Sequence, residues 1–139
     1  MSNDVMRREV NEARQAGKLA LQSLYRAREK LGSARNWGLL DLFGGGFFTD
    51  LMKHSKIRDA SVYVEEARKN LLIFQRELQD VDALVNLRVE INSFLSFADF
   101  FFDGLVADYL VQRGIADARE QVEDAISRVE YLLRQLENY

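Results

Sequence analysis

Small and apolar residues recur every three or four positions in three long stretches, and this spacing restricts the chain to packed helices. On a helix such a repeat lines one face, which can pack against a neighbouring helix. In the first stretch, residues 1–36, four of nine seam positions are alanine and one is Gly17, so a second helix can approach closely. This first seam consists of Met6, Val10, Ala13, Gly17, Ala20, Leu24, Ala27, Leu31 and Ala34.

The same repeat occurs in residues 57–81 and again in residues 115–139. The two seams coincide when the sequence is shifted by 58 residues. Aligning residues 41–80 with residues 99–138 without a gap gives 12 identities in 40 positions, which indicates an internal duplication. The two seams are Ile57, Ala60, Val64, Ala67, Leu71, Phe74, Leu78 and Val81, and Ile115, Ala118, Val122, Ala125, Val129, Leu132, Leu136 and Tyr139.

These repeats predict a single all-α domain, an antiparallel helical bundle with coiled-coil-like packing. The expected parts are a long N-terminal helix (1–36), a first repeat (37–81), a connector (82–92) and a second repeat (93–139). Each repeat is expected to form a helical hairpin, and the two hairpins are expected to be related by an approximate twofold axis. The connector breaks the helical period and reads as a loop with a short extended segment.

Each repeat is expected to contain a helix break, near residues 54–58 in the first and residues 112–116 in the second. Gly114 can supply a left-handed turn at the second break. Asp59 and Asp117 follow the two breaks, where aspartate is a favourable N-cap. The sequence therefore predicts that these carboxylates cap the second helix of each hairpin.

Composition excludes several classes of function. The 139 residues contain no cysteine, which excludes disulfides, thiolate nucleophiles, iron–sulfur clusters and zinc fingers. A net charge of −3 provides no general attraction to nucleic acid, and the basic residues of the first helix are mixed with acidic ones. No helix-turn-helix or aromatic stacking pattern is present, so we expect no specific nucleic-acid partner.

The most apolar run, residues 94–111, approaches the length of a membrane span. It contains Asp99, Asp103 and Asp108, and each carboxylate near the bilayer centre costs on the order of 2.5–3.5 kcal/mol on insertion scales. A buried helix in a soluble protein is therefore expected. The polar and acidic first fifteen residues do not resemble a signal peptide, so the cytoplasm is the expected compartment.

Three consecutive glycines, Gly44, Gly45 and Gly46, lie before Phe47 and form the first candidate site. Their backbone N–H groups can hold a phosphate or carboxylate at a helix N-terminus. The second repeat retains only the third glycine, as Gly104, and no Walker spacing follows. A structural turn is therefore the favoured interpretation, and an anion-binding turn is the alternative.

Asp50 and His54 form the second candidate site, because residues four apart share one face of a helix. They can act as a general base with its orienting carboxylate, or as two metal ligands. His54 is the only histidine, and its equivalent in the second repeat is Gln112. A surface or capping histidine is the favoured interpretation.

Four aspartates retained in both repeats form the third candidate, a ligand site or a polar core. If the repeats pack about a twofold axis, the carboxylates can meet and bind a divalent cation. The Glu-x-x-His pairs of di-iron bundles are absent, and a buried hydrogen-bond network is the favoured alternative. The four residues are Asp41, Asp50, Asp99 and Asp108.

The stretch NWGLLDLFGGGFFTDLMKHSKIRDA resembles a segment of uncharacterised bacterial all-helical proteins. The shared pattern is Trp-Gly, an aspartate three residues later, three glycines, Lys-His, and an apolar residue two before an aspartate. It falls on Trp37, Gly38, Asp41, Gly44 to Gly46, Lys53, His54, Ile57 and Asp59. The resemblance implies a bacterial origin and no particular activity.

The leading functional hypothesis is a nonenzymatic helical interaction or scaffold protein that binds a protein partner or itself. The alternative is a bundle that binds a small ligand or a divalent metal through Asp50, His54 and Asp108. No complete set of nucleophile, base and oxyanion donors is present, so neither an enzyme nor a cofactor is expected.

Overall fold

The computed structural model describes the backbone of residues 2–43, 47–81, 91–96 and 114–138, and their side chains except at residues 2–3 and 33–57. All four described segments are helical. Helix α1 spans Ser2–Phe43, α2 spans Phe47–Val81 and α5 spans Ile115–Glu137, with a shorter helix at residues 91–96. No strand occurs in these segments, so the expected all-α class is confirmed.

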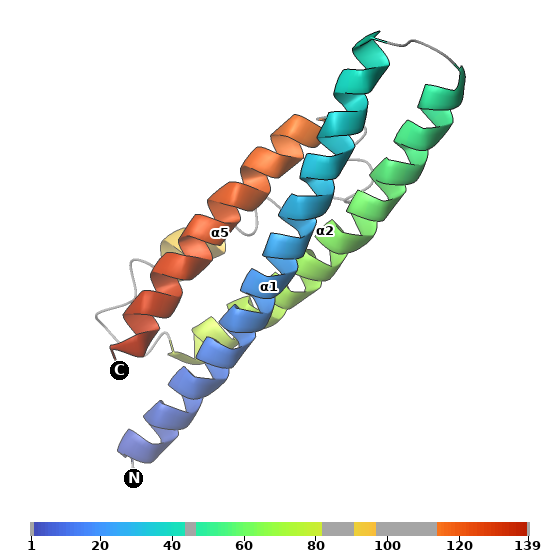
Figure 1. The fold of residues 1–139 in the computed structure, drawn as a ribbon. Helices are drawn as coiled ribbons and strands as arrows, with labels where there is room; N and C mark the ends of the chain where they lie inside the picture. Colours follow the sequence, from blue (N-terminus) through green and yellow to red (C-terminus); the bar gives the residue numbers. More distant parts are fainter. Residues whose placement is uncertain (1, 44–46, 82–90, 97–113, 139) are drawn as a thin grey trace.

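Helix α1 packs against both α2 and α5. Figure 1 shows that α2 and α5 run in the same direction and that α1 runs opposite to both. The short helix at residues 91–96 joins this assembly through Phe94, whose ring meets Phe74 of α2 edge-on at 5.4 Å between centroids. Arg128 of α5 donates a hydrogen bond from Nη1 to Ser93 Oγ at 3.3 Å.

The three predicted seams form the core. Nearly every seam residue with a described side chain is buried, and residues equivalent at a shift of 58 are buried alike in α2 and α5. Ile115 is partly buried. Met6 is the exception, because it remains 40% exposed near the N-terminal end of α1. The side chains of Ala34, Ile57 and Tyr139 lie outside the described part of the chain.

The predicted helix boundaries of the first repeat are wrong. Helix α1 does not end at residue 36 but continues to Phe43, and α2 passes through residues 54–58 without a break. Asp59 therefore lies inside α2 and caps nothing. The physical reason is that α2 contains neither glycine nor proline, so no residue interrupts its backbone hydrogen bonds.

The predicted connector is only partly described. Residues 82–90 lie outside the described segments, and residues 91 and 92 belong to the helix at residues 91–96 rather than to a loop. The apolar run at residues 94–111 also lies mostly outside them. Of the helices the structure describes, none combines the length and apolar character that a membrane crossing requires.

Gly114 precedes α5 with φ 91° and ψ 165°, a backbone conformation reached almost only by glycine. The φ of Gly114 is positive, as the predicted left-handed turn requires, but its ψ of 165° lies outside the left-handed region, so the predicted turn type is wrong. The predicted cap is wrong, because α5 begins at Ile115 and Asp117 falls within its first turn; no side chain caps this end.

Replacing Gly114 by alanine is expected to lower the free energy of unfolding by about 1 kcal/mol, because a Cβ strains a positive-φ backbone. An added Cβ would meet no atom within 4 Å, so the cost comes from the backbone alone. Urea unfolding followed by circular dichroism measures the change. A variant as stable as the wild type would contradict this assignment.

Polar contacts set the register between α1 and α2. Ser23 is buried, donates a hydrogen bond from Oγ to the Leu19 carbonyl at 2.8 Å, and accepts one from Asn70 Nδ2 of α2. About two helical turns further, Lys30 Nζ lies 5.2 Å from the ring centre of Tyr63. A part-buried polar pair beside an apolar seam favours one register, since a slip leaves both groups unpaired.

Candidate functional site

The structure does not bring the sequence-predicted site residues together within its described part. Asp41 belongs to α1, and Asp50 and His54 belong to α2, but their side chains are not described. Asp99, Asp108 and the glycines at 44–46 lie outside the described residues. The aspartate site, the Asp50–His54 pair and the anion-binding turn all remain predictions.

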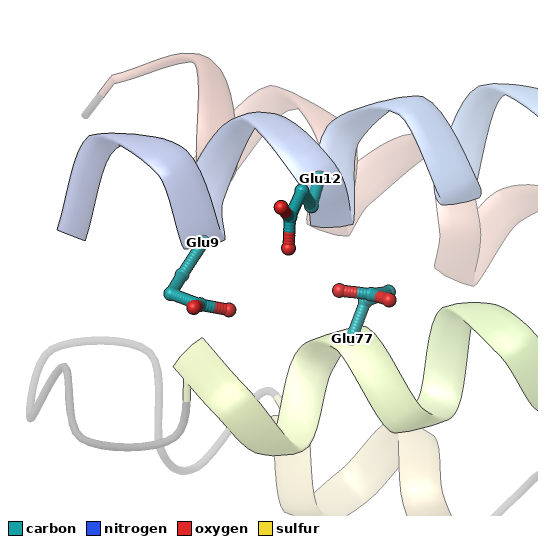
Figure 2. Close-up of side chains that lie close together, drawn as sticks. All are labelled: Glu9, Glu12 and Glu77. Carbon is teal, nitrogen blue, oxygen red and sulfur yellow. The ribbon is translucent and has the colours of Figure 1, made fainter. Parts of the chain in front are cut away.

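A different group of acidic residues converges between α1 and α2. Glu9 and Glu12 project from α1 toward Glu77 of α2 (Figure 2). One carboxylate oxygen from each residue lies within 4.8 Å of those of the other two. Glu9 and Glu12 are three residues apart and share a face of α1, and the antiparallel packing brings Glu77 opposite them.

The environment of Glu77 disfavours its charged form. Burial raises the pKa of this carboxyl above its ordinary value of 4.5, and the negative charges of Glu12, Asp80 and Glu9 raise that pKa further. The Oε2 atoms of Glu9 and Glu77 are buried and have no hydrogen-bond partner in the described structure. Glu77 thus lies among like charges, and its buried oxygen receives no hydrogen bond from the described residues.

Three carboxylates at this spacing suit two kinds of cationic group. Ca²⁺ and Mg²⁺ prefer carboxylate oxygens, and ligand oxygens around one such ion lie at comparable distances from one another. A lysine or arginine of another chain can also approach the charges from solvent. The arrangement of the three carboxylates therefore suits attraction of a cation.

Sequence reasoning missed this cluster. Glu9 and Glu12 are recognisable as neighbours on one helix, but many exposed helices carry such pairs. Glu77 joins them only in the observed register of α1 against α2, and the heptad repeat by itself permits several registers. The part-buried Ser23–Asn70 pair is a sequence signal that could have indicated it.

Replacing Glu77 by glutamine is expected to raise the stability at pH 7 by on the order of 0.5 kcal/mol, because it removes like-charge repulsion. The folded-state pKa of Glu77 lies above its unfolded value. The charged carboxylate therefore lowers the free energy of unfolding by its full amount at pH values above the folded-state pKa. This destabilisation fades as the pH falls toward 4.5, where protonation neutralises the carboxyl in both states.

Thermal melting of both proteins between neutral pH and the unfolded pKa measures this difference. The advantage of the glutamine variant should shrink steadily as the pH falls. A constant difference across this range would show that charge is not its cause. Glu130→Gln, a substitution on α5, is the matched control.

Comparison of the chain with protein-family models, with curated proteins and with solved structures finds no match.

Proposed function

We propose that the chain is a nonenzymatic helical interaction protein that acts by binding another protein chain. Support comes from aliphatic side chains that the bundle leaves in solvent on one side of the α1–α2 pair. Val5 and Leu19 of α1 are each 57% exposed, and Val62 and Ile73 of α2 are 65% and 48% exposed. We call this surface the flank.

Helix geometry places these side chains on one side. Val5 and Leu19 are two heptads apart on α1, and Val62 and Ile73 are eleven residues, or about three turns, apart on α2. Residues at these spacings share a helix face. Each pair therefore forms its own exposed stripe.

A contact between the helices joins the two stripes. Arg26 Nη1 of α1 lies 4.0 Å from Glu66 Oε1 of α2. Leu19 is one heptad before Arg26, and Ile73 is one heptad after Glu66. Because α1 and α2 are antiparallel, both steps lead in the same direction, so Leu19 and Ile73 occupy the same level of the flank.

The flank supports protein binding because several aliphatic residues are exposed on one side of the α1–α2 pair. Single exposed apolar residues are ordinary, but apolar anchors grouped along a helix face are typical of helix-mediated recognition. Charged residues separate these anchors: Arg26 and Glu66 lie on one side of the central pair, and Glu12 on the other. Such a mixed surface fits a specific protein partner rather than nonspecific aggregation.

Photo-crosslinking in cells tests this function. A photoreactive phenylalanine at position 73 should form covalent adducts with a protein chain. The same residue at position 72 should form far fewer, because neighbouring positions point about 100° apart around a helix. Leu72 is a matched control at 38% exposure. Equal yields at both positions, or none, would refute the proposed role of the flank.

The alternative is a bundle that binds a small ligand or divalent cation, as the aspartates suggested from the sequence. Among the described residues the observation that favours it is the Glu9, Glu12 and Glu77 cluster. Exposed acidic groups commonly gather without an ion, so protein association remains the preferred function. A cation at one hundred times its Kd should raise the stability by about 2.7 kcal/mol, and Glu77→Gln should reduce this gain.

Thermal melting with Mg²⁺, Ca²⁺ and Mn²⁺ separates the two functions. A rise in Tm that Glu77→Gln removes would support cation binding. Equal Tm values with and without each ion would eliminate cation binding for those metals.

A further inference from the structure

We propose that the flank binds an amphipathic helix of a partner protein, one that carries a lysine or arginine one heptad from its central aliphatic residue. This inference rests on the proposed function and names the chemistry of the partner. It follows from the surface on either side of the exposed pair Leu19 and Ile73, where the charges differ.

The form of the flank suits a helix. Helices α1 and α2 pack side by side and antiparallel, and Leu19 and Ile73 are exposed at one level of this pair. A third helix that lies along two neighbouring helices can contact both with one apolar face. Leu19 and Ile73 are therefore the central anchors of the proposed contact.

The flank is acidic one heptad toward the N-terminal end of α1. Glu12 is one heptad before Leu19, and Asp80 is one heptad after Ile73, so the antiparallel packing places both carboxylates at one level. Both residues are exposed. A partner helix seated on the aliphatic pair thus presents the residue one heptad away to these two carboxylates.

Further negative charge lies at the same place. Figure 2 shows Glu12 beside Glu9 and Glu77, and the charges of Glu12 and Asp80 both raise the pKa of the Glu77 carboxyl, as nearby anions do. Helix α2 ends at Val81 with no basic residue in its last turn, so its C-terminal carbonyls add partial negative charge. Four carboxylates and a helix C-terminus therefore lie together at this end of the flank.

Two arginines lie near these carboxylates. Arg8 and Arg76 are each four residues before Glu12 and Asp80, and both arginines are exposed. Among the described side chains, the ion pairs within 4.0 Å include neither arginine. The carboxylates outnumber these two cations, so a cation of a partner is attracted to this level.

The opposite end of the flank repels such a cation. Arg26 Nη1 lies 4.0 Å from Glu66 Oε1, so the carboxylate at this level already has a cationic partner. Lys30 lies over the ring of Tyr63 about one turn further. The difference between the two ends favours one orientation of a helix that is basic at one end only.

Fluorescence anisotropy with designed peptides and the purified full chain tests the inference. The probe is an alanine-rich peptide of about eighteen residues, with leucines along one helix face and one lysine on that face a heptad from the central leucine. One control peptide has glutamate in place of the lysine. The other has the lysine moved two positions, about 200° around the helix. The lysine probe should bind at least about fivefold more tightly than either control.

Matched charge variants locate the preference on the flank. Glu12→Gln combined with Asp80→Asn should bring the Kd of the lysine probe to within about twofold of that of the peptide with the moved lysine. Glu120→Gln combined with Glu137→Gln removes the same charge from exposed positions of α5 and should leave the preference unchanged.

Matched apolar variants locate the anchor. Ile73→Ser should raise the Kd of the lysine probe at least about fivefold, whereas Leu72→Ser, on another side of the same helix, should change it less than about twofold. Circular dichroism melts verify that all variants fold.

The outcomes separate this inference from the broader function. No binding of the lysine probe at about 500 µM, equal affinity for the glutamate peptide, or a preference that survives Glu12→Gln with Asp80→Asn would overturn the basic helix as the occupant. If position 73 then still crosslinks to a protein in cells, the interaction function stands with a partner of different chemistry. If position 73 forms no adduct, the proposed function fails, and this inference fails with it.

Discussion

Replacing Phe74 by alanine should destabilise the protein by about 3–5 kcal/mol, the usual cost of removing a buried aromatic ring. Phe74 has no solvent exposure and meets the ring of Phe94 edge-on. Its ring edge also faces the bare backbone of Gly17 on α1. The cavity would therefore open where α1, α2 and the helix at residues 91–96 meet. Because the total stability of a domain is typically 5–15 kcal/mol, the variant should be partly unfolded at physiological temperature.

Urea denaturation followed by circular dichroism measures the loss for Phe74→Ala. Leu72→Ala on the same helix is the matched control, and it should change the stability by less than about 0.5 kcal/mol because it deletes an exposed side chain. Phe74→Leu retains most of the volume and should cost less than Phe74→Ala. Equal losses for all three variants would show that Phe74 does not fill the core.

Replacing Gly17 by leucine should destabilise the protein by about 3 kcal/mol or more, because the side chain has no space between the helices. A Cβ at this position alone would lie 2.7 Å from Leu133 Cδ2 and 2.9 Å from Phe74 Cε1. These distances are shorter than real carbon contacts, so the side chain of Leu133 or Phe74 must shift. Leucine places three further carbon atoms in the same space.

Gly17→Ala and Gly32→Ala form a matched pair on α1. In a helix interior alanine is more favourable than glycine by about 1 kcal/mol, so both substitutions gain the same contribution from helix propensity. At Gly32 the nearest atom to a new Cβ is Arg119 Nη1 at 3.7 Å, an ordinary contact. Gly32→Ala should therefore stabilise the protein, whereas Gly17→Ala should destabilise it because the steric cost exceeds the local gain.

A double-mutant cycle locates the steric cost. Adding Leu133→Ala to Gly17→Ala removes the closest clashing atom, so the pair should be less destabilised than the sum of the single variants. Additive effects, or stabilisation by Gly17→Ala, would contradict close packing of α1 against α5 at this point.

The seam was the most predictable part of the fold. A strict repeat of small and apolar residues is favourable in water when it is buried along a helix face, and Ala60 and Ala118 are both buried at positions 58 residues apart. The role of Gly17 was predictable for the same reason, since a glycine within a helical seam is otherwise unfavourable.

The helix boundaries were less predictable. The predicted duplication placed a break at residues 54–58 as the counterpart of one expected at residues 112–116, but a break depends on the local backbone. Gly114 adopts a positive φ, whereas its counterpart in the first repeat is Lys56 within continuous α2. A long helix without glycine or proline continues unless tertiary contacts stop it.

The sequence by itself determined the helical class, the buried face of each helix and the close approach at Gly17, because periodicity and side-chain size act within a helix. Only the tertiary structure decided which faces meet between helices. The Glu9, Glu12 and Glu77 cluster, and the common level of Leu19 and Ile73, depend on the antiparallel register of α1 and α2. A heptad seam permits several registers of nearly equal apolar burial, and long-range contacts such as the Ser23–Asn70 hydrogen bond select among them.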